Sequence, residues 1–242
     1  MARLTLADGR ALDYQVRQSA RAKYMRMQLH PTHGLLVTQP PGVSARALHQ
    51  WVLSQQPWIT AALQKLAQHP PPAAAVSTLP ERLALLATGE NLHVIYTPSA
   101  RKSITLHYLE HATLTLTGAV SDPAHCQQAL RQWLRSYAQV HLSKQLRQVA
   151  AETGLHYVNC RIKGQQTRWG SCSARGNINL NEKLMLLPPE WVRYVLIHEL
   201  CHTVEMNHSK RFWALVAGFV PEYKAIHAQM KGAMGQLPGW VR

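Results

Sequence analysis

Apolar and polar residues alternate through the first forty positions, which is the pattern of half-buried β-strands. We expect short strands at residues 4–6, 12–16, 25–29 and 35–37. Ser44 can then cap a helix that runs to about Gln55, and Pro57 suits the first turn of a second helix. The chain therefore begins with strands followed by a helical segment.

A second set of strands follows a stretch rich in proline and alanine. Residues 69–75 are typical of a loop or linker, because consecutive prolines fit neither a helix interior nor a central strand. Beyond them we expect strands at residues 92–96, 104–108 and 114–116. We assign residues 1–120 to an N-terminal β-rich basic region with a helical segment.

The pattern changes to a helical one near Ser121. Ser121-Asp122-Pro123 is a helix start and Gly154 is a good stop, so a long amphipathic helix is expected between them. His141 lies on its apolar stripe and is interpreted as a core or boundary residue.

Strands and helices alternate after this long helix. Strands are expected at residues 157–162 and 177–181, on either side of a loop rich in glycine and serine. Apolar helical segments follow from about Glu190 past His202, and at residues 212–230. We therefore predict an α+β protein with a second domain at residues 121–242.

The composition is that of a globular protein, with 46% hydrophobic residues. No run of 18 apolar residues and no apolar N-terminal leader is present, so we expect a cytoplasmic protein without a membrane partner. The four cysteines form no C-x-x-C pair and are interpreted as free thiols.

The charge is strongly positive. There are 26 Lys and Arg residues against 12 Asp and Glu, a net charge of +14, and residues 14–80 contain no carboxylate. Such a charge favours polyanions, so nucleic acid and nucleotides are candidate partners. A basic surface that only confers solubility is the alternative.

The strongest chemical signal is an H-E-x-x-H motif at residues 198–202. On a helix, residues four apart lie about 40° apart around the axis and about 6 Å along it. His198 and His202 can therefore bind one metal ion, for which zinc is the expected cofactor. Glu199 is rotated off this stripe and is the candidate catalytic base. A pair of hydrogen-bonded core histidines is the alternative.

A catalytic zinc site usually has three protein ligands and one open position. His208 is the candidate third ligand from its spacing, provided that the chain turns between His202 and His208. Glu205, Glu222 and His227 are rival ligands. Zinc would lower the pKa of a bound water towards about 7, and Glu199 would accept its proton.

Several further segments accompany the motif. They are Thr167 to Ser173, Gly176 to Asn181, Tyr194-Val195 before the motif, Asn207-His208-Ser209 and Phe212-Trp213. Together they resemble the YgjP-like metallopeptidase family, a zincin-like group related to SprT-like and WLM metalloproteases. The resemblance is best over about residues 160 to 213 and weaker over nearly the whole chain.

The resemblance implies a zincin-like C-terminal domain, with zinc held by His198, His202 and His208 and with Glu199 catalytic. It also implies a protein or peptide substrate. In zincins a sheet edge commonly pairs with an extended peptide, so residues 177–181, and Asn179 among them, are candidates for substrate binding. An ordinary strand with one solvated face is the alternative.

A nucleotide substrate remains a second hypothesis. No acid occurs between Thr153 and Asn181, whereas Arg168 and Arg175 lie in a glycine-rich loop that could hold phosphates. The same metal site could then act as a nucleoside triphosphate pyrophosphatase. A third hypothesis is a nucleic-acid-binding module with a structural zinc, in which Glu199 would be dispensable.

Overall fold

The computed structural model describes residues 2–6, 9–30, 34–68, 79–109 and 112–242. The chain divides into two compact units, residues 1–74 and residues 75–242, and it mixes helices with three sheets, which confirms the predicted α+β class. The linker predicted at residues 69–75 lies outside the described residues.

The first unit is a four-stranded sheet with two helices on one face. Its strand order is β1-β2-β4-β3, with a parallel pair at β2 and β4. The strands are β1 (Ala2–Thr5), β2 (Ala11–Gln18), β3 (Arg26–His30) and β4 (Gly34–Gln39), and the helices are α1 (Ala45–Ser54) and α2 (Gln56–Gln68). As predicted, Ser44 caps α1 by accepting a hydrogen bond from the amide of Ala47. Tyr14, Val37 and Val52 are buried in this unit's own core.

The second unit contains a sheet with the same topology. Its order is β5-β6-β8-β7, again with antiparallel, parallel and antiparallel pairs in turn. The strands are β5 (Arg82–Leu85), β6 (Glu90–Pro98), β7 (Thr105–Leu109) and β8 (Thr113–Gly118). The last three match the predicted strands, whereas β5 was not predicted.

These two similar sheets belong to different units because different helices cover them. The first packs on α1 and α2, whereas Leu83 and Leu116 of the second share a core with Leu130 and Leu134 of α3 (Pro123–Thr153). The boundary predicted at residue 120 is therefore wrong: the division lies between Ala74 and Ala75, because burial on α3 joins residues 82–118 to the C-terminal half.

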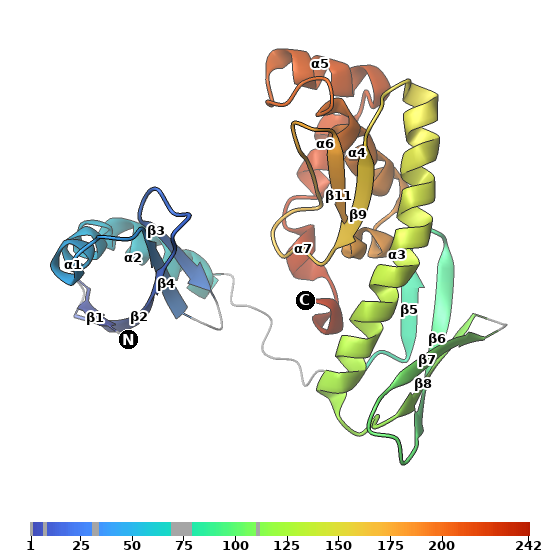
Figure 1. Cartoon of the computed structure of the whole chain (residues 1–242), viewed down its shortest axis with the longest axis horizontal. Helices are drawn as coiled ribbons and strands as arrows, with labels where there is room; N and C mark the ends of the chain where they lie inside the picture. The colour runs from blue at the N-terminus through green and yellow to red at the C-terminus, as the bar shows by residue number, and fades with distance from the viewer. Residues whose placement is uncertain (1, 7–8, 31–33, 69–78, 110–111) are drawn as a thin grey trace. The chain divides into compact units, whose positions relative to one another are not determined.

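Helix α3 runs past both sheets of the second unit (Figure 1). The Asp122 side chain caps it, and Gly154 ends it in the left-handed conformation with φ 69°, as the start and stop residues predicted. His141 is half-buried and stacks on Tyr137 with ring centroids 4.0 Å apart. It is thus a boundary residue, as expected.

The third sheet lies beside the helix that carries the H-E-x-x-H motif. Its order is β10-β11-β9, with β9 (Asn159–Lys163), β10 (Gly170–Cys172) and β11 (Asn177–Asn181). Helices follow as η1 (Glu182–Leu186), α4 (Pro189–Cys201), α5 (Lys210–Phe219), α6 (Tyr223–Gln229), α7 (Ala233–Gln236) and η2 (Gly239–Val241). The expectation that residues 177–181 offer a free sheet edge is wrong, because β11 pairs on both sides.

An ion pair between a half-exposed arginine and a buried glutamate joins α3 to this region. Nε of Arg135 lies 2.5 Å from a carboxylate oxygen of Glu182, whose side chain is 2% exposed. A Cβ added at Gly164 would meet both partners within 2.8 Å, so glycine leaves the space that this pair occupies. The pair therefore fixes η1, which precedes α4, against the long helix.

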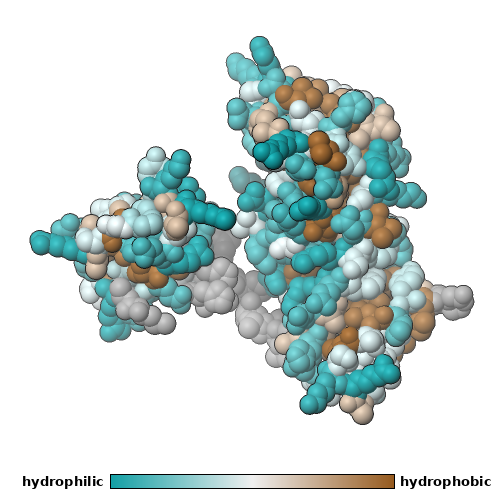
Figure 2. All heavy atoms as spheres, in the orientation of Figure 1, coloured by the Kyte–Doolittle hydropathy of each residue, from teal (hydrophilic) through white to brown (hydrophobic). Residues whose placement is uncertain are grey.

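Hydrophilic side chains are common on the visible surface of both units (Figure 2). Hydrophilic residues cover most of the visible face of the first unit, and apolar residues are scattered in smaller areas on the second (Figure 2). Among the described helices, none combines the length and the apolar character needed to cross a membrane.

Candidate functional site

Helix α4 places three ring side chains on one face. Pro189 occupies the first turn, where a missing amide hydrogen costs nothing, and the helix ends at Cys201. Tyr194, His198 and His202 follow one another at four-residue intervals, so their side chains line up along the helix. Most of α4 is buried, so its polar side chains need partners inside the protein.

The chain turns back after α4 and brings His208 to this face. The amides of Thr203, Val204 and Glu205 bond to carbonyls of the last turn of α4, which closes the helix. Ser209 then caps α5 by accepting from the amide of Phe212. As a result, Nε2 of His208 lies 3.1 Å from Nε2 of His198. The turn that the sequence required is present.

His198, His202 and His208 form a cluster whose ligand atoms all lie within 4.8 Å of one another. Two ligand nitrogens on one tetrahedral zinc ion lie about 3.3 Å apart, as bond lengths of about 2.0–2.1 Å require. The Nε2 separation of 3.1 Å between His198 and His208 fits that requirement. Nδ1 of His202 lies 3.1 Å from the carbonyl oxygen of Glu205, which orients this ring and leaves its Nε2 for a metal.

The electrostatics also suit a metal. Burial, with the neighbouring histidines, lowers the pKa of His198 to about 3, and burial likewise lowers the pKa of His202. Both rings are therefore neutral at physiological pH, as ligation requires. Among the described residues, Nδ1 of His198 and Oε2 of Glu199 are buried without a hydrogen-bond partner.

The rival ligands have other positions. Glu205 offers its backbone carbonyl to His202, and Glu222 stands at the N-terminus of α6. Nδ1 of His227 lies 3.0 Å from the hydroxyl of Tyr194. Within the described residues the histidine cluster thus comprises the three histidines that the resemblance implied.

Aromatic residues of α5 support these rings. Phe212 is fully buried and stacks on His202 with centroids 4.4 Å apart. Trp213 stacks on His208 at 5.4 Å. Two consecutive residues of one helix therefore hold the second and third histidines in place.

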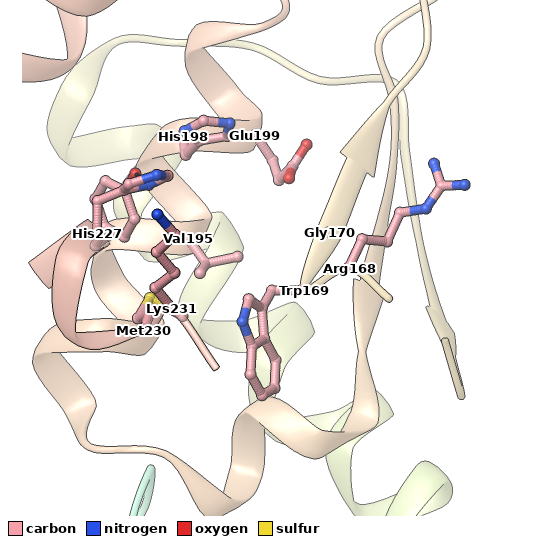
Figure 3. Close-up of a pocket in the computed structure, with 10 residues that line it drawn as sticks. Arg168, Trp169, Gly170, Val195, His198, Glu199, His227, Met230 and Lys231 are labelled. Atoms are coloured by element: carbon pink, nitrogen blue, oxygen red, sulfur yellow. Dashed lines mark hydrogen bonds between the residues drawn. The ribbon is translucent and has the colours of Figure 1, made fainter. Parts of the chain in front are cut away.

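Glu199 points from α4 towards strand β10 (Figure 3). It is 5% exposed, and burial raises the pKa of its carboxyl group to about 8, an effect that the charge of Arg168 partly offsets. Gly170 faces it so closely that an added Cβ would lie 2.5 Å from Oε1. Glycine at this position gives the carboxyl group its space.

A cavity of about 320 Å³ opens beside Glu199 and His198. Figure 3 shows His227 on one side of this cavity, with Trp169 and Arg168 on the other. The described residues that line it are Arg168, Trp169, Gly170, Tyr194, Val195, His198, Glu199, His227, Met230 and Lys231.

The three predicted substrate-binding residues have different places. Arg168 lines the cavity. Asn179 lies outside the lining set and donates to Oγ of Ser171, 3.2 Å away, so its side chain joins β11 to β10. Arg175 also lies outside that set, in the exposed turn between these strands. For Asn179 and Arg175, substrate binding stays a prediction.

Sequence reasoning missed several residues of the cavity. The contact between Gly170 and Glu199 depends on how β10 packs on α4, which no local pattern encodes. Met230 and Lys231 follow α6 and reach the cavity only through the packing of the C-terminal helices. The sequence could have indicated Tyr194, because it stands one helical turn before His198 on the same face of the helix.

Two solved structures are similar to part of this chain. The crystal structure of the metallopeptidase zymogen of Pyrococcus abyssi abylysin is 27% identical, with a TM-score of 0.34, over 37% of this chain and 90% of that one. The corresponding zymogen of Methanocaldococcus jannaschii jannalysin is 18% identical, with a TM-score of 0.35, over 38% of this chain and 96% of that one.

A curated protein of Escherichia coli (strain K12), named UTP pyrophosphatase, is 27% identical over 84 residues. The match covers 35% of this chain and 47% of that protein, so this chain spans about half the length of its curated relative. Residues 23–233 match the family described as YgjP-like, metallopeptidase domain, and this range includes most of both units. The chain therefore belongs to the YgjP-like metallopeptidase family.

Proposed function

We propose that this protein is a zinc-dependent peptidase in which His198, His202 and His208 hold the metal and Glu199 is the general base. The observation that carries the proposal is the convergence of three histidines beside a buried carboxyl group that borders a cavity. An ordinary core histidine pair would not need a third histidine brought back by a turn.

When bound, zinc would polarise the substrate carbonyl and acidify a water molecule. Glu199 accepts a proton from the attacking water and delivers it to the leaving amine. Gly170 has no side chain, so the carboxyl group of Glu199 has room to move from the attacking water to the leaving amine.

The cavity and the adjacent strand suit a peptide. β10 is the edge strand of its sheet, next to Glu199, so an extended chain can pair with it. Trp169, Val195 and Met230 give the cavity an apolar wall for one side chain of the substrate. We therefore propose β10, rather than β11, as the strand that pairs with an extended peptide substrate.

A nucleoside triphosphate pyrophosphatase is the second candidate. Arg168 and Lys231 line the cavity, and Glu199 is the one carboxylate among its described lining residues, which suits phosphates. The curated relative named UTP pyrophosphatase points the same way, although the match covers only 47% of that protein. The metal site would be shared, and only the substrate would differ.

Mass spectrometry of products distinguishes the two. The zinc-loaded protein and its Glu199→Gln variant are incubated with unfolded casein, with and without DNA, and with a mixture of nucleoside triphosphates. Peptide fragments from the wild type alone would establish the peptidase, and pyrophosphate with a nucleoside monophosphate would establish the second candidate. Products at equal rates from both proteins would refute a role for Glu199.

Nucleic acid stays a proposed partner, which is why DNA is included. On the sheet of the first unit, Arg17 and Arg26 flank Thr38 on neighbouring strands, and both arginines are exposed. Cleavage of a DNA-bound protein should therefore rise with DNA and fall with added salt.

Arginine variants test the second candidate separately. Arg168→Gln should lower triphosphate turnover more than about tenfold at unchanged zinc content, because a charge-assisted contact to phosphate is lost. Arg101→Gln is the matched control, since this arginine is exposed and lies outside the cavity lining. Equal turnover by the wild type and both variants would count against phosphate binding in the cavity.

A further inference from the structure

His227 borders the cavity opposite Arg168 but lies outside the histidine cluster (Figure 3). It comes from α6, a different element from the H-E-x-x-H helix. Its ring is exposed, so it is free to meet a molecule in the cavity. The hydroxyl of Tyr194 lies 3.0 Å from Nδ1 of this ring.

Tyr194 determines which nitrogen of His227 carries the hydrogen. Tyr194 is 3% exposed, and burial raises its pKa to about 12, so its hydroxyl stays protonated. A buried hydroxyl hydrogen without an acceptor is costly, and Nδ1 is the acceptor that the described neighbours supply. The hydroxyl therefore donates to Nδ1. A neutral imidazole then carries its own hydrogen on Nε2.

The surrounding rings hold this arrangement. Trp213 meets His227 edge-on with centroids 6.0 Å apart, and Trp213 itself stacks on Tyr223 at 5.2 Å. Tyr194 stands on the same face of α4 as His198, one turn earlier. The Nε2–H group of His227 is therefore fixed relative to the histidine cluster through Tyr194 on one side and Trp213 on the other.

We propose that His227 is a catalytic residue whose Nε2–H donates a hydrogen bond to the substrate oxygen on which negative charge develops, and that Tyr194 is the residue that positions it. The inference rests on the proposed hydrolase function. A carbonyl oxygen of a peptide and a phosphoryl oxygen of a nucleotide present the same acceptor to this donor. Donors aimed at developing charge stabilise the transition state more than the bound substrate.

Nitrogen NMR of the full chain tests the orientation without any turnover. Histidine is labelled with ¹⁵N, and His227 is assigned from the spectrum of His227→Gln. The wild type should show the Nε2–H tautomer, and Tyr194→Phe should show a mixture of both tautomers. Titration with inorganic phosphate, used as an oxyanion probe, should shift Nε2 more than Nδ1. The Nδ1–H tautomer in the wild type would overturn the inference.

Kinetics tests the catalytic role on whichever substrate is hydrolysed. His227→Leu should lower kcat by about 10²-fold, the lower end for loss of an oxyanion donor because this ring is exposed. His227→Gln keeps an N–H donor and should retain more of the activity. Tyr194→Phe should lower kcat by less than His227→Leu, with little change in KM.

Zinc content and a control variant separate the outcomes. All three variants should bind zinc at the stoichiometry of the wild type; loss of zinc from His227→Leu would make His227 a ligand and overturn the inference. His141→Leu is the matched control, because His141 also contacts a tyrosine but lies outside the cavity lining. If Glu199→Gln abolishes turnover while His227→Leu keeps it within about threefold, His227 is not catalytic. If the wild type hydrolyses neither substrate, the proposed function fails. The phosphate titration then tests on its own whether Nε2–H of His227 donates a hydrogen bond to an oxyanion.

Discussion

Replacing Glu199 with glutamine should stabilise the metal-free second unit, and the gain should grow with pH. The carboxyl group is 5% exposed, Oε2 has no hydrogen-bond partner among the described residues, and burial raises its pKa from 4.5 to about 8. Between these two values the unfolded chain loses a proton that the folded protein keeps. The free energy of unfolding of the wild type therefore falls as pH rises through this range.

The size of the effect follows from the two pKa values. At about 1.4 kcal/mol per pH unit, the burial of this group costs about 3 kcal/mol at pH 7 and about 5 kcal/mol above pH 9. Glutamine has nearly the same shape and no charge, so it avoids this cost. The variant and the wild type should differ least near pH 4, where the carboxyl group is protonated in both states.

His198 changes the pH dependence of the free energy of unfolding in the opposite direction, but its effect is the same in the wild type and in the Glu199→Gln variant. Its pKa falls from 6.5 to about 3 on folding, so the unfolded chain gains a proton first as pH drops below about 6.5, and stability is lost towards acid. Both proteins carry His198. The difference between them consequently reports Glu199 alone.

Urea denaturation of the chelator-treated proteins measures the effect. Because the chain has two compact units, unfolding is followed by hydrogen exchange of peptides from α4, which report only on the second unit. Glu190→Gln, at an exposed position of the same helix, should change stability by less than about 0.5 kcal/mol at every pH. A Glu199→Gln gain that is the same at pH 4 and pH 9 would refute the reasoning.

Three further predictions follow from single contacts. Gly170→Ala should lower turnover by more than about tenfold at unchanged zinc content measured by plasma mass spectrometry, because its Cβ would lie 2.5 Å from Oε1 of Glu199 and displace that side chain. His208→Ala should weaken zinc binding in a chelator competition by more than about 100-fold, since loss of outer-shell partners already costs about 10–100-fold; unchanged affinity would exclude His208 as a ligand. Arg135→Ala should destabilise the second unit by about 1–2 kcal/mol in thermal denaturation, because buried Glu182 would lose a partner that is itself half-exposed, whereas Arg135→Lys should recover part of this loss.

Local patterns predicted the elements that carry their own signals. The cap at Ser44, the stop at Gly154 and the alternating strands depend on neighbours in sequence, and all three are present. The spacing of His198 and His202 likewise follows from the geometry of one helix. Residues whose partners lie within about five positions were therefore predictable.

Partners from distant segments were not predictable in the same way. The domain boundary depends on which helix covers the sheet at residues 82–118, and the order of β9, β10 and β11 depends on how a loop folds between them. Asn179 shows the difference: its alternation correctly predicted a strand, but only the pairing with both neighbours reveals that this strand is central. Spacing predicted His208 only on condition of a turn, and the resemblance supplied the remaining argument.

The alignment of Tyr194, His198 and His202 along α4 has a consequence for motion in the site. Within one helix the rise of about 6 Å per four residues is fixed by backbone hydrogen bonds, so these three side chains move as one body. A displacement of α4 by a fraction of an ångström would leave their mutual spacing intact, but it would change the gap between Glu199 and Gly170 and the separation of His198 and His208. Slow motions of α4 against β10, on the microsecond-to-millisecond scale of packed elements, would therefore shift Glu199 relative to Gly170 while His198 and His202 kept their mutual spacing.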